Sequence, residues 1–359
     1  MSEPLDRAFE LYEQCEARAD EGDFPGAETL CRQALAIFER EEPRSANVAN
    51  VLHSLGVILE RQAKFYGAAE CAEQAVQILE ATDDDAKLLL AQTYGIWGNA
   101  LRMMNQFDEA RDRFRKAVEI AETLQDHPIE LAGALNNLGV LDAFAGDPDR
   151  AQQAYGRALD IARSSQGEHH DMVAAVSRNL ARLMLDQQRY AEAEEPARRA
   201  WQIRRESMGD EHPATLADAG VYAAVLDALG RHRESKAIYE RLLAAYKQNS
   251  GAESYEYAAT LHNLAVAEQG SGQVERAIDA CRRSLAIKEK VLGAEHPDTA
   301  LSEMNLGAML LEHGDREEAG IALRNALTLL ERTLPADHPH LQLCRDLLNN
   351  ASRERIDHF

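Results

Sequence analysis

Four asparagines recur at multiples of 42 residues in this chain: Asn137, Asn179, Asn263 and Asn305. An amide side chain offers two donors and an acceptor, which match the two ends of a peptide unit. One interpretation is therefore that these side chains bind a ligand. The alternative is an internal ladder, in which the amides bond along their own helices or across to the next helix. The spacing leaves both interpretations open.

Two arginines accompany one of these asparagines. Arg178 and Arg182 stand one helical turn apart beside Asn179, so together they could clamp a carboxylate through paired hydrogen bonds. The alternative is that Arg182 pairs with Asp186, four residues on, in a surface ion pair of small value. Three further residues complete the candidate ligand-binding set, namely Arg102, Asn136 and His262.

Catalytic chemistry has no comparable signature. The chain has no P-loop, no H-E-x-x-H and no G-x-S-x-G motif. The segment Glu168–Asp171 contains two histidines and two carboxylates, but adjacent side chains diverge rather than chelate. We therefore expect neither an enzyme nor a metal or other cofactor. An enzyme, or a subunit associated with one, remains the least favoured alternative.

The charge of the chain argues against nucleic acid and membrane as partners. The formal net charge is −22, from 61 acidic and 39 basic side chains. A field of that sign repels phosphate backbones and anionic lipid, so we expect neither nucleic acid nor membrane as a partner. Met1–Glu10 lacks the apolar core of a signal peptide, and the five cysteines include no C-x-x-C pair. We expect a cytoplasmic protein with buried, reduced cysteines.

The asparagines belong to a repeat. A small anchor residue recurs at spacings of 41 or 42 residues, at Ala27, Ala68, Ala110, Ala151, Ala193, Ser235, Ala277 and Ala319. Five residues before the anchor stands a glycine in five of the eight units, and seven residues after it stands another small residue in every unit but the sixth. The recurring asparagine position lies fourteen residues before the anchor. Apolar residues at helical spacing flank each turn, so each unit is predicted to be a helical hairpin.

The units are joined by a second recurring element. It reads Gly209–Pro213 (GDEHP) and Gly293–Pro297 (GAEHP), with variants at Gly167–Asp171, Asp126–Pro128 and Asp337–Pro339. Glycine closes one helix and proline opens the next at its first position. The element therefore has a structural explanation and needs no catalytic one.

These motifs resemble the tetratricopeptide repeat family, in its 42-residue form found in kinesin light chains, from roughly Leu5 to Leu334. The resemblance implies an all-α fold, a right-handed α-α superhelix of eight hairpins over residues 1–339. Residues 340–359 would form a capping helix and tail, with Leu341 and Cys344 on its apolar side. The heptad segment that precedes the repeats of a kinesin light chain is not seen before the first repeat, so motor-cargo function is not implied.

The resemblance also implies where a ligand would bind. The first helices of the hairpins would line a concave groove, and the repeated asparagine would point into it. We expect a non-catalytic adaptor or scaffold that captures an extended segment of a protein or peptide, acidic or C-terminal in character. The alternative is a regulatory sensor, in which a short peptide changes how the array contacts another protein.

Overall fold

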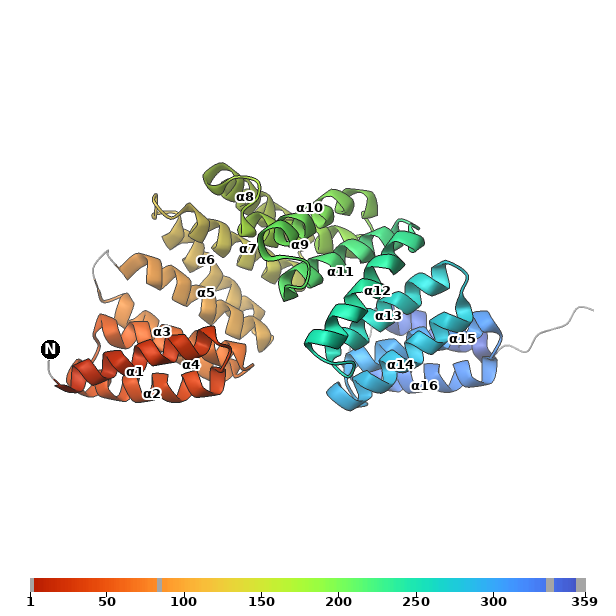
Figure 1. Ribbon diagram of the computed structural model, residues 1–359, viewed down its shortest axis with the longest axis horizontal. Coiled ribbons are helices and arrows are strands. Elements are labelled where there is room, and N and C mark those ends of the chain that lie inside the picture. Colours follow the sequence, from red (N-terminus) through yellow and green to blue (C-terminus); the bar gives the residue numbers. More distant parts are fainter. Residues whose placement is uncertain (1–2, 83–85, 334–338, 353–359) are drawn as a thin grey trace, which may run out of the picture. The chain divides into compact units, whose positions relative to one another are not determined.

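The computed structural model describes residues 3–82, 86–333 and 339–352, and over these residues the chain forms helices and turns without a β-strand (Figure 1). This confirms the predicted all-α fold class. The chain divides into two compact units, Met1–Leu183 and Met184–Phe359. Each unit is described by itself below.

The first unit is a series of helical hairpins in which each odd-numbered helix packs against the next even-numbered one. Its helices are α1 (Glu3–Asp20), α2 (Phe24–Glu41), α3 (Ala46–Arg61), α4 (Phe65–Leu79), α5 (Lys87–Met103), α6 (Phe107–Ala121), α7 (Pro128–Phe144), α8 (Pro148–Gln166) and α9 (Asp171–Asp186), which runs into the second unit.

The second unit continues the pattern and ends in one additional helix. Its helices are α10 (Tyr190–Met208), α11 (Pro213–Ala228), α12 (His232–Asn249), α13 (Tyr255–Gly270), α14 (Val274–Leu292), α15 (Pro297–His313), α16 (Arg316–Thr333) and α17 (Pro339–Ser352). The predicted junction Asp337–Pro339 lies mostly outside the described residues, as does the tail beyond Ser352.

The turn inside every hairpin uses the same backbone conformation. The residue five positions before the anchor has a positive φ in all eight repeats, at Gly22, Ala63, Asn105, Gly146, Gln188, Gly230, Gly272 and Gly314. This left-handed residue ends the first helix of the hairpin and is most favourable for glycine. Three repeats place a side chain there nonetheless, so the tertiary packing overrides the local preference at those turns.

The anchor residues lie where the two helices of a hairpin come closest. All eight are 0% exposed. Where the second helix instead carries a large side chain, a glycine on the first helix can allow the two helices to lie equally close. A Cβ on Gly98 would lie 2.7 Å from the ring of Phe114, and one on Gly139 would lie 2.7 Å from the ring of Tyr155. The hairpins therefore depend on small residues facing large ones across the helix pair.

The junction histidines have a specific structural task. The ring Nδ1 of His212 accepts a hydrogen bond from the backbone N–H of Ala214 at 3.2 Å, and Nδ1 of His296 does the same for Asp298 at 3.1 Å. His170 caps the next helix in the same way, through Met172 at 3.1 Å. Because the first N–H groups of a helix have no partner within it, these rings act as N-caps.

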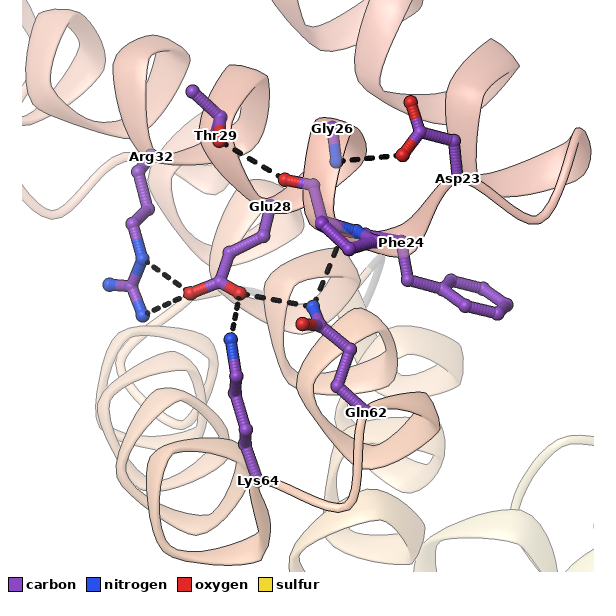
Figure 2. Close-up of polar contacts among 9 residues, drawn as sticks. Asp23, Phe24, Gly26, Glu28, Thr29, Arg32, Gln62 and Lys64 are labelled. Carbon is purple, nitrogen blue, oxygen red and sulfur yellow. Dashed lines mark hydrogen bonds and ion pairs between the residues drawn. The ribbon is translucent and has the colours of Figure 1, made fainter.

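The half-buried carboxylate of Glu28 links the first repeat to the second (Figure 2). Glu28 on α2 accepts hydrogen bonds from Arg32 at 3.0 Å, from Lys64 at 2.6 Å and from Gln62 at 3.0 Å. Gln62 also donates to the backbone oxygen of Phe24 at 3.3 Å. The hydrogen bond from Lys64 is the main reason that the pKa of Glu28 lies below its usual value.

Helix α17 closes the apolar end of the second unit. Leu341 and Cys344 are buried, at 1% and 0% exposure, and pack with Leu323, Ala326 and Leu330 of α16. This is the contact expected of a terminal helix in a repeat array, whose last hairpin would otherwise expose its core.

A pair of leucines on α17 tests this role. Leu341→Ala removes a fully buried side chain and is expected to lower the free energy of unfolding by about 2–5 kcal/mol, through lost burial and a new cavity. Leu343→Ala is the control, because Leu343 is 47% exposed on the same helix. Denaturant unfolding of both variants gives the comparison. Equal effects of the two substitutions would show that α17 does not seal the core.

Candidate functional site

A polar slot recurs between the first helices of neighbouring repeats. It joins the position fifteen residues before the anchor in one repeat to the position fourteen residues before the anchor in the next. Three side-chain pairs occupy this inter-repeat slot: Tyr12 and Ser54 at 2.8 Å, Asn136 and Asn179 at 2.8 Å, and His262 and Asn305 at 2.9 Å. Four of the predicted site residues therefore contact one another in pairs.

The other two asparagines meet glycine in the same slot. Gly95 stands opposite Asn137, and a Cβ built on this glycine would lie 3.9 Å from the Asn137 amide nitrogen. In the second unit the residue at the position opposite Asn263 is Gly220. Within the described part of the chain, neither amide forms a side-chain hydrogen bond, and Asn263 is exposed while Asn137 is half-buried. Since glycine has no side chain, it offers neither amide a side-chain partner in the slot.

His262 belongs to a buried network in the second unit. Its Nε2 lies 2.9 Å from the amide nitrogen of Asn305, which can only donate, so Nε2 is the acceptor. Its Nδ1 lies 3.4 Å from the hydroxyl of Ser302, which also accepts from Lys288 at 2.9 Å and donates to the backbone oxygen of Asp298 at 3.0 Å. Burial lowers the pKa of His262 to about 4. The ring is therefore neutral and structural at neutral pH.

His53 occupies the equivalent position in the second repeat. Its slot partner would be Ile96, which offers no polar atom, and His53 bonds instead to the hydroxyl of Thr93 at 3.0 Å. Burial lowers the pKa of this histidine to about 4 as well.

These two histidines make stability depend on pH. The ordinary pKa of 6.5 applies in the unfolded chain, and the folded values near 4 mean that the unfolded state binds more protons between pH 6.5 and pH 4. Stability is therefore fully present above pH 6.5 and falls as the pH drops through this window, by up to about 1.4 kcal/mol per histidine and pH unit. Denaturant unfolding at pH 7.5 and 5.5 measures the loss. A His53→Gln/His262→Gln variant should lose less between the two pH values, and an unchanged loss would contradict the assignment.

Three predicted arginines gather around one tyrosine in the first unit. Burial raises the pKa of Tyr155, and the charges of Arg182, Arg102 and Arg178 oppose this shift while that of Asp142 adds to it. The guanidinium of Arg102, on α5, stacks over the ring of Phe144 at 5.3 Å, and burial lowers its pKa. We call Arg102, Arg178 and Arg182 the arginine cluster. Several cations close to a part-buried surface suit a carboxylate ligand.

The degree of exposure differs within the arginine cluster. Arg182 is exposed, whereas Arg178 and Arg102 are half-buried. The Nε atom of Arg102 is buried and has no hydrogen-bond partner among the described residues. Beside the arginine cluster, the large apolar side chain of Phe144 is 65% exposed. An incoming segment could therefore combine a carboxylate with an apolar group here.

Sequence reasoning missed part of this arrangement. It did not identify Phe144, Tyr155 or the two glycines that free Asn137 and Asn263. The glycines could have been found by aligning adjacent positions of successive repeats, because the slot joins two positions in register. Helical spacing placed Arg102, Arg178 and Arg182 on the same face of the array, but their shared neighbour Tyr155 depends on how α5, α8 and α9 pack.

No metal-binding group of three or more histidine, cysteine or carboxylate side chains occurs within residues 3–82, 86–333 and 339–352. At the histidine pair considered from the sequence, His170 is instead a helix cap. The five cysteines are all buried, as predicted. Among the helices that the structure describes, none has the length and apolar character needed to cross a membrane.

Known structures have the same fold. The chain is similar to the apo form of RapI, at 14% identity over 79% of this chain and 98% of that chain, with a TM-score of 0.61. It is also similar to a Rap protein complexed with Competence and Sporulation Factor, at 14% identity over 97% and 98% of the two chains and a TM-score of 0.56. A putative kinesin light chain of Podosopora anserina with nearly identical repeats is 25% identical over 58% of this chain and 97% of that chain, with a TM-score of 0.49.

Family models establish the relationship. No curated protein matches the chain. Models described as tetratricopeptide repeat match residues 7–81, 90–128, 130–206 and 256–332, which is more than half of the chain. The matched segments leave out most of the sixth repeat. With its all-α repeat array and these matches, the chain belongs to the tetratricopeptide repeat family.

Proposed function

We propose that the protein is a non-catalytic adaptor or scaffold that binds an extended segment of a partner protein on the first helices of its repeats. The observation that carries this proposal is the division among the four asparagines. Two amides are used within the fold, whereas Asn137, opposite Gly95, and Asn263 form no side-chain hydrogen bond within the described residues. An unpartnered amide is suited to bond a peptide backbone through its donors and its acceptor.

The arginine cluster supports a carboxylate in the bound segment. The whole chain has a net charge of −22, so an acidic ligand is repelled over most of its surface. Arg102, Arg178 and Arg182 provide a local exception in the first unit, beside the helix that carries Asn137. A single carboxylate, from an acidic side chain or a C-terminus, would therefore bind at this point, with the neighbouring backbone bonded by Asn137.

The second candidate is a peptide-responsive regulator that acts on another protein. A protein with this fold, the Rap protein noted above, is complexed with Competence and Sporulation Factor. In such a regulator the binding of a short peptide changes the relative stability of two arrangements of the repeats. An adaptor binds its partner whether or not a peptide is present, so measuring partner affinity with and without peptide distinguishes the two functions.

The asparagines provide the central test. Affinity purification with the intact chain, followed by mass spectrometry, identifies the partner, and calorimetry then measures the affinity of each variant. Asn137→Ala and Asn263→Ala should each weaken binding by about 0.5–1.5 kcal/mol and leave the melting temperature nearly unchanged. Asn179→Ala and Asn305→Ala are the matched controls, because they remove a hydrogen bond within the fold and should lower stability. Normal binding by both Asn137→Ala and Asn263→Ala would refute the proposal.

The arginine cluster makes a separate prediction. Arg178→Ala or Arg182→Ala should weaken binding by about 1.5–3 kcal/mol if the side chain bonds a carboxylate, and added salt should reduce wild-type affinity. Arg115→Ala is the control, since Arg115 is an exposed arginine on the second helix α6. Amidation of the partner peptide's C-terminus shows whether the carboxylate is terminal. Wild-type affinity in both variants would exclude the arginine cluster as the carboxylate site.

A further inference from the structure

A cavity of about 360 Å³ lies in the second unit, among α10, α11 and α12. Its apolar walls come from Trp201, Leu216, Ala219, Ile238, Leu242 and Ala245. Most of these residues belong to the second helices of the fifth and sixth repeats, so the cavity does not involve the asparagines of the inter-repeat slot. Its volume falls in the range of about 300–1,000 Å³ that is usual for small-ligand sites.

The sixth repeat departs from the others at one wall position of this cavity. Ten residues after the anchor, the eighth repeat has Leu329 and the sixth has Ala245, while the other six all have isoleucine: Ile37, Ile78, Ile120, Ile161, Ile203 and Ile287. A second wall residue is also small. Ala219, sixteen residues before the anchor, corresponds to leucine in four other repeats: Leu11, Leu52, Leu135 and Leu261.

One wall residue of the sixth repeat is larger than its counterparts, but it does not fill the cavity. Leu242 replaces the small residue found seven positions after the anchor in every other repeat, and it is buried at 3% exposure. The cavity remains beside it. Open apolar space lowers the stability of a fold, because its walls lose packing contacts. The two alanines leave more of the apolar wall open than isoleucine and leucine would, and a ligand bound there would supply the missing contacts.

The aromatic wall of the cavity is held in place. The indole of Trp201 stacks on Tyr222, with ring centroids 5.5 Å apart and an interplanar angle of 24°. The guanidinium of Arg205 lies 4.9 Å from the centre of the indole ring. A fixed aromatic wall favours an aromatic ligand, because rings gain energy from offset or edge contacts beyond that of burial. The volume is also ample for a ring, since engineered cavities of about 150 Å³ bind benzene.

The rim of the cavity has a net negative charge. Arg241 forms an exposed ion pair with Asp210 at 3.7 Å, which leaves the carboxylate of Glu211 as the uncompensated charge. Within the described residues Glu211 forms no ion pair through its side chain. Its backbone oxygen accepts a hydrogen bond from Asn249 at 3.4 Å, which holds this loop against α12. A ligand with a positive charge next to its apolar group complements this rim.

We infer that the cavity among α10, α11 and α12 binds one aromatic side chain of a positively charged partner segment. The ring occupies the space left by Ala245 and Ala219, and a neighbouring ammonium or guanidinium group lies at Glu211. This site is independent of the first-helix surface and of the arginine cluster, which would select the opposite charge. Loss of binding at one site leaves the other intact.

Ala245→Ile is the decisive variant, because it introduces the isoleucine of six other repeats and narrows the cavity. The probes are phenethylamine, which carries a ring and an ammonium group, and phenylacetate, which carries a ring and a carboxylate. Saturation-transfer NMR with the full chain measures the binding of each. We expect phenethylamine to bind saturably to the wild-type protein and at least tenfold more weakly to Ala245→Ile, with a melting temperature equal to or above that of the wild type.

The controls separate cavity filling from other effects. Ala286→Ile adds the same side chain at an exposed position of α14 and should bind phenethylamine as the wild type does. Ala245→Val, which fills less of the space, should give an intermediate loss and replaces Ala245→Ile if the larger side chain prevents folding. Glu211→Gln should weaken phenethylamine severalfold, and phenylacetate should bind more weakly than phenethylamine. Equal binding of phenethylamine to the wild type and Ala245→Ile, or no binding to either, would overturn the site. Equal binding of the two probes would refute the proposal that the partner segment is positively charged.

Discussion

The close approach of two helices at a small residue is the constraint on which the rest of the structure depends. The eight anchor residues, from Ala27 to Ala319, are all fully buried. At Phe114 and Tyr155, where a large residue follows on the second helix, a glycine faces it on the first. A hairpin built in this way cannot bury its remaining apolar face alone, so it must stack on a neighbour, and the repeats follow.

The features with functional potential occur where single repeats depart from this shared pattern. A glycine in the inter-repeat slot removes the partner of one amide without disturbing the hairpin, as Gly95 does for Asn137. An alanine in place of isoleucine, at Ala245, leaves part of a cavity wall unfilled. A repeat array tolerates such changes because each repeat contacts only its neighbours, so the loss of packing or hydrogen bonding stays local.

Electrostatics gives the two proposed sites opposite preferences. The arginine cluster offers fixed positive charge within a strongly acidic chain, whereas the rim of the cavity beside Glu211 is negative. Buried histidines contribute in a third way. His53 and His262 are held neutral by burial, so they bond as ordinary polar groups at neutral pH and weaken the fold on acidification.

The sequence by itself determined the repeat, the hairpin, the turn and the all-α class, because each rests on short-range periodicity and on residue types that repeat eight times. It also identified the asparagine positions, since they recur in register. Only the tertiary structure decided which amides are occupied, that Arg102, Arg178 and Arg182 share Tyr155 as a neighbour, and that Ala245 borders open space. These facts depend on contacts between side chains about 40 residues apart, as between Asn136 and Asn179. Such contacts are set by how neighbouring hairpins stack, which no single repeat specifies.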